Sequence, residues 1–271
     1  MRKIIFLSCL FVFLSAKEIA QPWSTGSAYV TPHHRWEIGL FQPLKYGLAP
    51  GLEVATHPLA MAVIPNLTIK RTLNLPATGV WATVHSLTYP TPLMNMLARE
   101  GTGGLVSPEF EFPAAVIFYN EIRVSRTIKK NILMTSKVGL ALGKTFGDLD
   151  NRTTIDFPLI FQRLSPLYDG AYLRIGADLE FKKLNIFGWH LSDRWQLLLD
   201  DDLFLIAGKE HRIGLEHKGL LIWNKTEKFR FTVGYKIVFG QYPFGTQWNI
   251  MPPHIQLLPV WLPLFDIQWA W

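Results

Sequence analysis

The sequence predicts an all-β fold, a single antiparallel transmembrane β-barrel of about twelve strands, with ten or fourteen strands also compatible. Three observations lead to this prediction. Apolar and polar residues alternate along segments of ten to twelve residues, the chain is rich in aromatic and poor in charged residues, and its first 20 residues have the pattern of an export signal. A soluble β-sandwich would also alternate, so the prediction depends on all three together.

The alternation is clearest in the segment KFRFTVGYKIVF, Lys228 to Phe239. Its odd-numbered residues from 229 to 239 are aromatic or aliphatic, whereas the opposite face carries Lys228, Arg230 and Lys236. Segments 132–143, 171–182 and 212–223 repeat this pattern. Strands of this length are about twice the usual globular length and match a tilted strand that crosses a membrane. One apolar face opposite a face with charges of both signs indicates a barrel with lipid outside and a polar lumen.

Strands are expected near 35–42, 51–57, 66–72, 79–88, 114–125, 132–143, 155–163, 171–182, 195–206, 212–223, 228–239 and 262–271. An even number is expected of a single-chain bacterial barrel with short turns at one end and long loops at the other. Segment 241–261 then falls among the long outer loops, but 89–113 falls at the end of the short turns. Either one strand is miscounted, or segment 89–113 is an inward plug or a flap.

The beginning of the chain predicts export. Arg2 and Lys3 are basic, and an apolar stretch follows to Leu14. Small residues come next, and this order is typical of a signal peptide that is cleaved near residue 16 or 20. We therefore assign 1–20 to a signal peptide and 21–271 to one barrel domain. Cys9 is the only cysteine, whereas a secreted eukaryotic domain would usually carry disulfides. A bacterial envelope protein fits this composition better.

The last seven residues, FDIQWAW, place Phe265, Ile267, Trp269 and Trp271 on one face of the final strand. This strand resembles the terminal targeting strand of bacterial outer-membrane β-barrel proteins, which ends on an aromatic residue preceded by apolar residues at alternate positions. The resemblance implies a multi-pass barrel in the outer membrane of a diderm bacterium, in contact with its lipids. It also implies insertion by the cell's barrel-assembly machinery, which would recognise these four residues.

Charged residues on the polar faces of the later strands are the predicted lining of the lumen. They could form a salt-bridged interior that fills the barrel, or a polar pore in which the basic surplus of the last strands favours anions. The predicted lining consists of Arg174, Asp178, Glu180, Lys182, Asp200, Asp202, Arg212, Glu216, Lys218, Arg230 and Lys236.

Other motifs point less clearly to chemistry. His190 and Ser192 have the His-x-Ser spacing of some outer-membrane lipases and deacylases, but they fall in an expected turn without an evident acidic partner. Asp201 shares its face with apolar residues, so we expect it near a membrane interface or at a bulge. One aspartate triplet does not supply the oxygens of a calcium site. No metal, cofactor or nucleic-acid partner is predicted.

These observations leave three functional hypotheses. The first is a pore or transporter for small polar or anionic solutes. The second is a membrane-embedded lipid hydrolase, so that enzymatic activity is undecided but not favoured. The third is a closed barrel that serves other envelope proteins as a structural or assembly partner.

Overall fold

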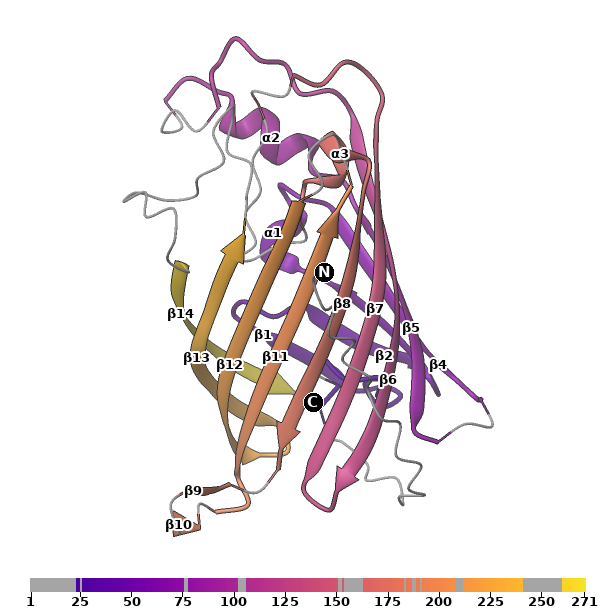
Figure 1. Cartoon of the computed structure of the whole chain (residues 1–271), viewed down its shortest axis with the longest axis vertical. Coiled ribbons are helices and arrows are strands. Elements are labelled where there is room, and N and C mark those ends of the chain that lie inside the picture. The colour runs from indigo at the N-terminus through magenta and orange to yellow at the C-terminus, as the bar shows by residue number, and fades with distance from the viewer. Residues whose placement is uncertain are drawn as a thin grey trace, which may run out of the picture.

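The structure, a computed structural model, describes residues 23–24, 26–75, 78–101, 106–150, 153, 163–182, 184–186, 189–190, 192–207, 212–240 and 260–271. The signal peptide assigned to 1–20 lies outside these residues. Twelve antiparallel strands form one closed barrel, which confirms the predicted fold class and strand number. The first strand pairs with the last, Ile38 opposite Trp269, and this pairing closes the sheet on itself (Figure 1).

The barrel strands are β1 (Trp36–Gly39), β2 (Leu44–Ala49), β3 (Leu52–Thr56), β4 (Asn66–Leu73), β5 (Val80–Thr88), β6 (Ala115–Lys129), β7 (Ile132–Thr145), β8 (Ala171–Phe181), β11 (Trp195–Ile206), β12 (Arg212–Thr226), β13 (Phe229–Gly240) and β14 (Val260–Ala270). A small separate hairpin consists of β9 (Asn185–Ile186) and β10 (Trp189–His190). In the described part of the chain, three short helices lie in connections: α1 (Pro58–Met61), α2 (Thr91–Leu97) and α3 (Pro166–Asp169).

The number twelve was correct, but one predicted strand was wrong and one real strand was missed. The segment 155–163 lies outside the described residues except for Arg163, which is not in a strand. β7 pairs directly with β8, from Ile132 opposite Phe181 to Leu142 opposite Ala171, so no strand lies between them. The missed strand is β2, which pairs with both β1 and β3.

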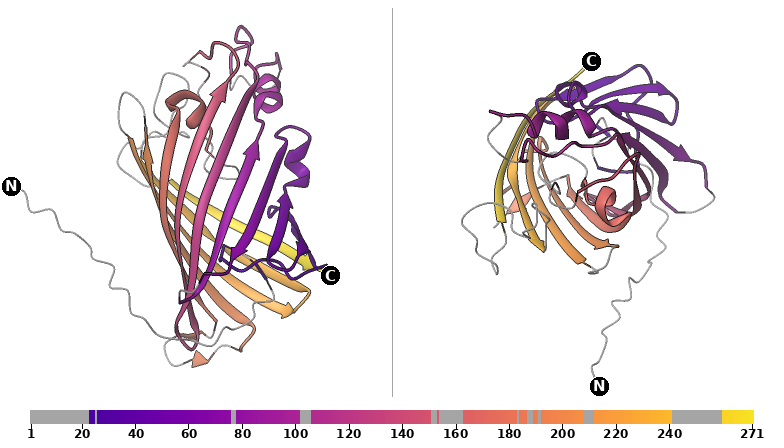
Figure 2. Two further views of the ribbon diagram at one scale, coloured as in Figure 1. Left: turned by 90° about the vertical axis from the view of Figure 1, so that its right-hand side faces the viewer. Right: turned by 90° about the horizontal axis from the view of Figure 1, so that it is seen from above.

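This correction removes the inconsistency in loop lengths. With β2 included, the connections 57–65, 89–114, 146–170 and 241–259 all join strands at the end of the barrel that carries the three helices. We call this the helix end. The opposite turn end has the short connections 50–51, 74–79, 130–131 and 227–228 and one longer connection, 182–194, which carries the β9–β10 hairpin (Figures 1 and 2). The segment 89–113 is therefore a long loop at the helix end and not a flap at the turn end.

Alternation along the strands separates an apolar outer face from a polar interior. In β14, Asp266, Gln268 and Ala270 are buried inside, whereas Phe265 and Trp269 are exposed outside. Among the described residues, no helix is long and apolar enough to cross a membrane.

Candidate functional site

The barrel interior collects most of the charged side chains predicted to line a lumen. Asp178, Glu180, Asp200, Asp202, Glu216 and Arg230 are buried, and Arg174, Lys218 and Lys236 are half-buried beside them. Partial burial lowers the pKa of the Lys182 ammonium group, which follows β8, and Glu180 acts in the opposite direction. Arg212 begins β12, but its side chain lies outside the described part.

The centre of the interior is organised around Lys137 of β7, which the sequence placed on a polar face but not among the lining residues. Its Nζ lies 2.6 Å from Asp178 Oδ1, 2.6 Å from Asp200 Oδ1 and 3.2 Å from Asp202 Oδ1. Gly176 of β8 stands between Lys137 and Asp202 in the strand register, and a Cβ there would overlap the Asp202 carboxylate. The missing side chain thus lets an ion pair form across an intervening strand.

Two of these three carboxylates also contact a second cation. Asp200 also contacts Lys218 Nζ at 2.6 Å, and Asp202 contacts Arg174 Nη2 at 2.5 Å. The three cations of this cluster therefore balance the formal charges of its three carboxylates.

A second group lies toward the helix end. Arg163 lies in the connection between β7 and β8, and its side chain extends into the barrel. Its guanidinium carbon lies 4.1 Å from the centre of the Phe204 ring. It contacts Glu216, whose other oxygen lies 2.7 Å from Lys236 Nζ. Arg163 could not be predicted from strand alternation because it comes from a loop.

The chain before β1 folds back into the turn end of the interior. In this N-terminal segment, residues 23–24 and 26–32, Ser24, Ala28 and Thr31 are fully buried. Thr31 donates from its backbone N–H and its hydroxyl to Glu53, at 2.7 and 2.8 Å. Ala28 N–H donates to Ser125 Oγ at 2.8 Å. The segment therefore occupies the lumen through hydrogen bonds to two different parts of the wall, β3 and β6.

Two further contacts hold the beginning of this segment. Arg123 donates to the carbonyl oxygen of Gly26 at 2.9 Å, and the Arg230 guanidinium lies 4.2 Å from the ring of Trp23. An inward plug was considered for 89–113, but this inward segment is N-terminal. Its small polar residues resemble an ordinary linker, so alternation gave no signal for it.

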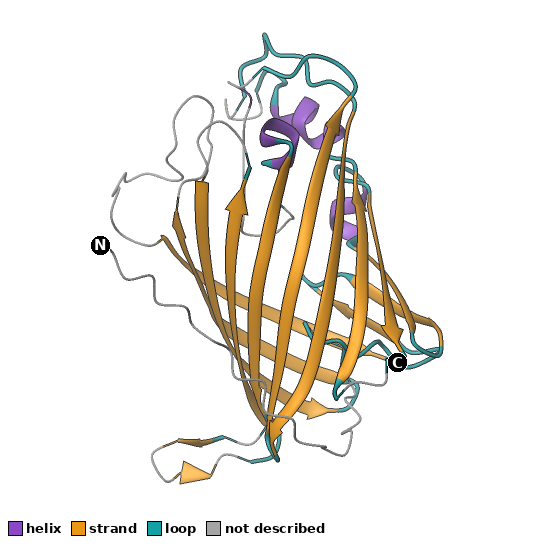
Figure 3. Ribbon diagram, turned by 45° about the vertical axis from the view of Figure 1, so that its right-hand side comes forward, coloured by secondary structure: helices purple, strands orange, loops and turns teal. Residues whose placement is uncertain are grey.

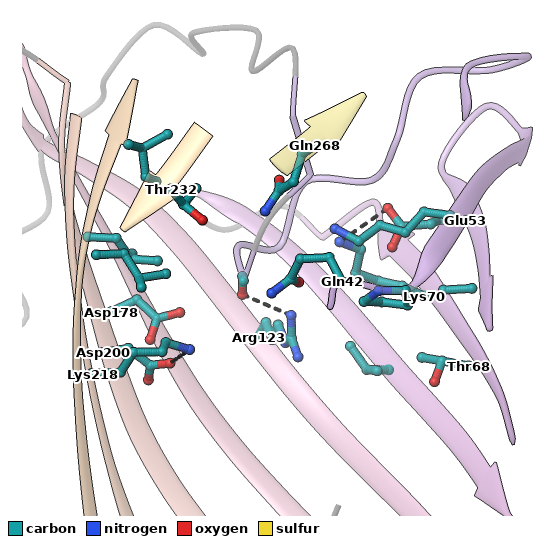
Figure 4. A pocket seen from close by; sticks show the side chains of 18 of the residues that line it. Gln42, Glu53, Thr68, Lys70, Arg123, Asp178, Asp200, Lys218, Thr232 and Gln268 are labelled. Carbon is teal, nitrogen blue, oxygen red and sulfur yellow. Dashed lines mark hydrogen bonds and ion pairs between the residues drawn. The ribbon is translucent and has the colours of Figure 1, made fainter. Parts of the chain in front are cut away.

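Two cavities remain between these groups. One of about 260 Å³ lies toward the N-terminal segment (Figure 4), and one of about 330 Å³ lies toward the helix end. Basic side chains outnumber acidic ones in the lining of both. The basic ones are Lys45, Lys70, Arg123, Arg163, Arg174, Lys218, Arg230 and Lys236, and the acidic ones are Glu53, Asp178, Asp200, Asp202 and Glu216.

The helix end of the barrel is covered by an apolar cluster. Met94 of α2 and Leu167 of α3 pack with Tyr172, Phe204 and Ile206 of the wall. The view from above shows the helices over the barrel mouth (Figure 2). Among the described residues, the interior is thus polar in the middle, covered by an apolar layer at one end and occupied by the N-terminal segment at the other.

The His190–Ser192 pair lies away from this interior. His190 ends the β9–β10 hairpin, which projects beyond the turn end (Figure 3), and its side chain lies outside the described part. Ser192 is exposed. No group of three His, Cys, Asp or Glu side chains suited to a metal ion occurs in the described ranges.

The predicted targeting residues lie on the outer face at the turn end, within a belt of aromatic rings. Phe229 and Trp269 rings lie 6.0 Å apart, Trp195 and Trp223 rings 6.2 Å apart, and Trp36 stacks on Tyr46. Phe265, Trp269 and Trp271 are exposed, and Ile267 is half-buried beside them.

Comparison with protein-family models, with curated proteins and with solved structures finds no match to the chain.

The packing of the N-terminal segment on Gly47 gives a first testable prediction. A Cβ at Gly47 would overlap the carbonyl oxygen of Pro32, so Gly47→Val should push residues 23–32 away from the wall and lower the stability by about 1–3 kcal/mol. Hydrogen exchange should become faster at Ala28 and Thr31. The matched control is Leu48→Val, which changes an exposed outer side chain of the same strand. Unchanged exchange in the Gly47 variant would contradict this packing.

Proposed function

We propose that the protein is an integral barrel of a bacterial outer membrane that passes small anionic solutes through its lumen, with the N-terminal segment as a gate. The observation that carries the proposal is the pair of cavities rich in basic groups inside a barrel with an apolar outer face. The aromatic belt at the turn end supports the membrane location, because indole rings favour the interface between lipid and water.

Arg230 is the residue best suited to receive an anion. It lines the cavity next to the N-terminal segment and also a third cavity that opens among the turn-end residues. Its Nε donates to Gln268 Oε1 at 2.5 Å, and its guanidinium group lies over the ring of Trp23. Within the described part of the chain it makes no ion pair, although three carboxylates, those of Glu37, Glu180 and Asp266, lie near enough to act on its charge. Trp23 covers its guanidinium, so a solute that enters from the turn end reaches this charge when Trp23 moves aside.

The test is ion conductance of the folded mature protein in a planar lipid bilayer. We expect reproducible unitary steps, and a reversal potential in a potassium chloride gradient that favours chloride. Arg230→Gln should reduce this preference, because it removes a buried positive charge from the path. Arg71→Gln, which changes an exposed outer residue of β4, is the matched control. Cation preference, or equal selectivity in both variants, would contradict the anionic assignment.

One observation favours a second candidate, a closed barrel that acts as a partner of other envelope proteins. The apolar cluster around Met94 and Leu167 covers the helix end. This candidate predicts no conductance from a demonstrably folded barrel and fixed companions on purification. A lipid hydrolase that uses Ser192 predicts instead that Ser192→Ala changes the lipid composition of the membrane.

A further inference from the structure

The exposed charges of the barrel differ in sign between its two ends. Among the described residues of the turn end, six cations are exposed but only two acids, Asp193 and Glu227. At the helix end the balance is reversed in the described part of the chain. Two exposed cations, Arg99 and Lys144, lie there among four exposed acids, Glu100, Glu109, Glu111 and Asp148. The two ends therefore present surfaces of opposite charge to their surroundings.

Between the two ends, the outer face of the described strands carries one exposed charged side chain, that of Asp201 in β11. Its Oδ1 lies 2.7 Å from Nδ1 of His217, whose Nε2 lies 3.1 Å from the hydroxyl of Tyr235. Asp201 was expected near a membrane interface or at a bulge. The register around it is unbroken, so no bulge is present, and it lies six positions from Trp195 in the aromatic belt.

We call the six exposed cations of the turn end the basic collar: Arg71, Lys129, Lys130, Arg194, Lys225 and Lys228. Several of them come directly next to the aromatic belt. Arg194 precedes Trp195, Lys228 precedes Phe229, and the Lys225 ammonium group lies 5.9 Å from the centre of the Phe229 ring. In a membrane, aromatic rings favour the level where hydrocarbon meets the head groups, so cations just beyond the rings meet the phosphates.

The charges of the basic collar are not used within the barrel. None of its six side chains forms an ion pair in the described ranges. By contrast, Lys45, Lys70, Lys137, Lys218 and Lys236 of the interior each contact a carboxylate. Because an ammonium group has three N–H donors and a guanidinium group five, the collar can donate to many phosphate oxygens.

The basic collar is spread around the barrel and does not form one patch. Its members come from β4, from the β6–β7 turn, from the connection before β11 and from the β12–β13 turn. In the strand order, this stretch covers more than half of the closed sheet. A folded partner protein would contact one side of the barrel, whereas a lipid leaflet meets the barrel on all sides at one level. The spread of the cations therefore favours lipid as the occupant.

We propose that the basic collar binds the head groups of anionic phospholipids in the leaflet that meets the turn end. Each cation acts through attraction to the negative membrane surface and through hydrogen bonds to phosphate oxygens. The acidic helix end repels the same head groups, so the preference is confined to one end of the barrel. The inference rests on the membrane location proposed above but not on transport.

The test measures lipid selectivity at the surface of the barrel. The full mature protein is inserted into phosphatidylcholine vesicles, and flotation verifies insertion. Electron spin resonance then compares traces of spin-labelled phosphatidylglycerol and phosphatidylcholine, because it separates lipid chains immobilised on the protein from chains of the bulk bilayer. We expect phosphatidylglycerol to associate severalfold more strongly, and the preference to disappear in about 1 M salt, where the Debye length is ~3 Å.

Neutral variants locate the preference on the barrel. Lys129→Gln with Lys130→Gln should remove part of it, and adding Lys225→Gln with Lys228→Gln should remove most of it, because the cations act at separate places around the barrel. The matched control is Arg99→Gln with Lys144→Gln, which neutralises two exposed cations at the helix end and should leave the preference unchanged.

Three results would overturn the proposal. They are equal association of the two lipids with the unaltered protein, an equal loss of preference in the control, and binding of soluble poly-glutamate without any lipid preference. The last result would assign the basic collar to an acidic protein instead. Failure of the protein to float with vesicles would overturn the proposed membrane location.

Discussion

Replacing Lys137 with methionine is expected to lower the stability of the barrel by about 3–5 kcal/mol, because the change leaves buried carboxylates without their shared cation. The Lys137 ammonium group is the common contact of Asp178, Asp200 and Asp202 and is itself 2% exposed. Methionine keeps the length of the side chain and loses only its charge. The unfolding midpoint, followed by circular dichroism in detergent, should fall by on the order of 10 °C.

Two further variants separate charge from packing. Lys144→Met changes an exposed lysine on the outer side of the same strand and should leave the midpoint unchanged. Adding Asp178→Asn to Lys137→Met should restore part of the loss, since it removes one of the unpaired charges, and the double-mutant cycle measures their coupling. A midpoint unaffected by Lys137→Met would mean that water, and not this lysine, neutralises the acidic groups.

The fold could be predicted from the sequence wherever strands are long and alternate strictly. The sequence predicted six strands close to their observed ranges: β6, β7, β8, β11, β12 and β13. In each of them, polar residues face the interior and apolar residues face outward, so the alternation is easy to recognise. β2 was missed because Pro43, Gly47 and Pro50 make a short strand look like a loop. The apolar run at 155–163 was taken for a strand instead, and the two errors cancelled in the strand number.

The interior could be predicted only in part, since alternation assigns a face but not a partner. Lys70, Glu121 and Arg123 obey the same alternation as the predicted lining residues and could have been included on that ground. The contacts of Lys137 with three acidic groups depend on the register of β7, β8 and β11, which is set by pairing between distant segments. The burial of Ser24 and Thr31 depends on where the chain enters the barrel, and no local pattern encodes that.

Removing residues 21–31 from a chain that begins at residue 21, as the expected signal cleavage would leave it, is expected to raise its unitary conductance severalfold. These residues include the groups that bind Glu53, Ser125 and Arg123 from inside the lumen. Their loss widens the turn end, and it exposes Arg230 by removing Trp23 from its guanidinium. The two proteins are compared in the same planar bilayer after circular dichroism has shown equal strand content.

The shortened protein also locates the narrowest part of the path. If the N-terminal segment limits passage, Trp23→Ala alone should give part of the increase, because Trp23 covers the arginine that lines both the inner and the turn-end cavity. If instead both proteins conduct equally, the segment is no gate and the apolar layer around Met94 limits passage at the helix end. Met94→Ser would then be the substitution that opens the barrel, since it weakens that layer without touching the ion pairs of the interior.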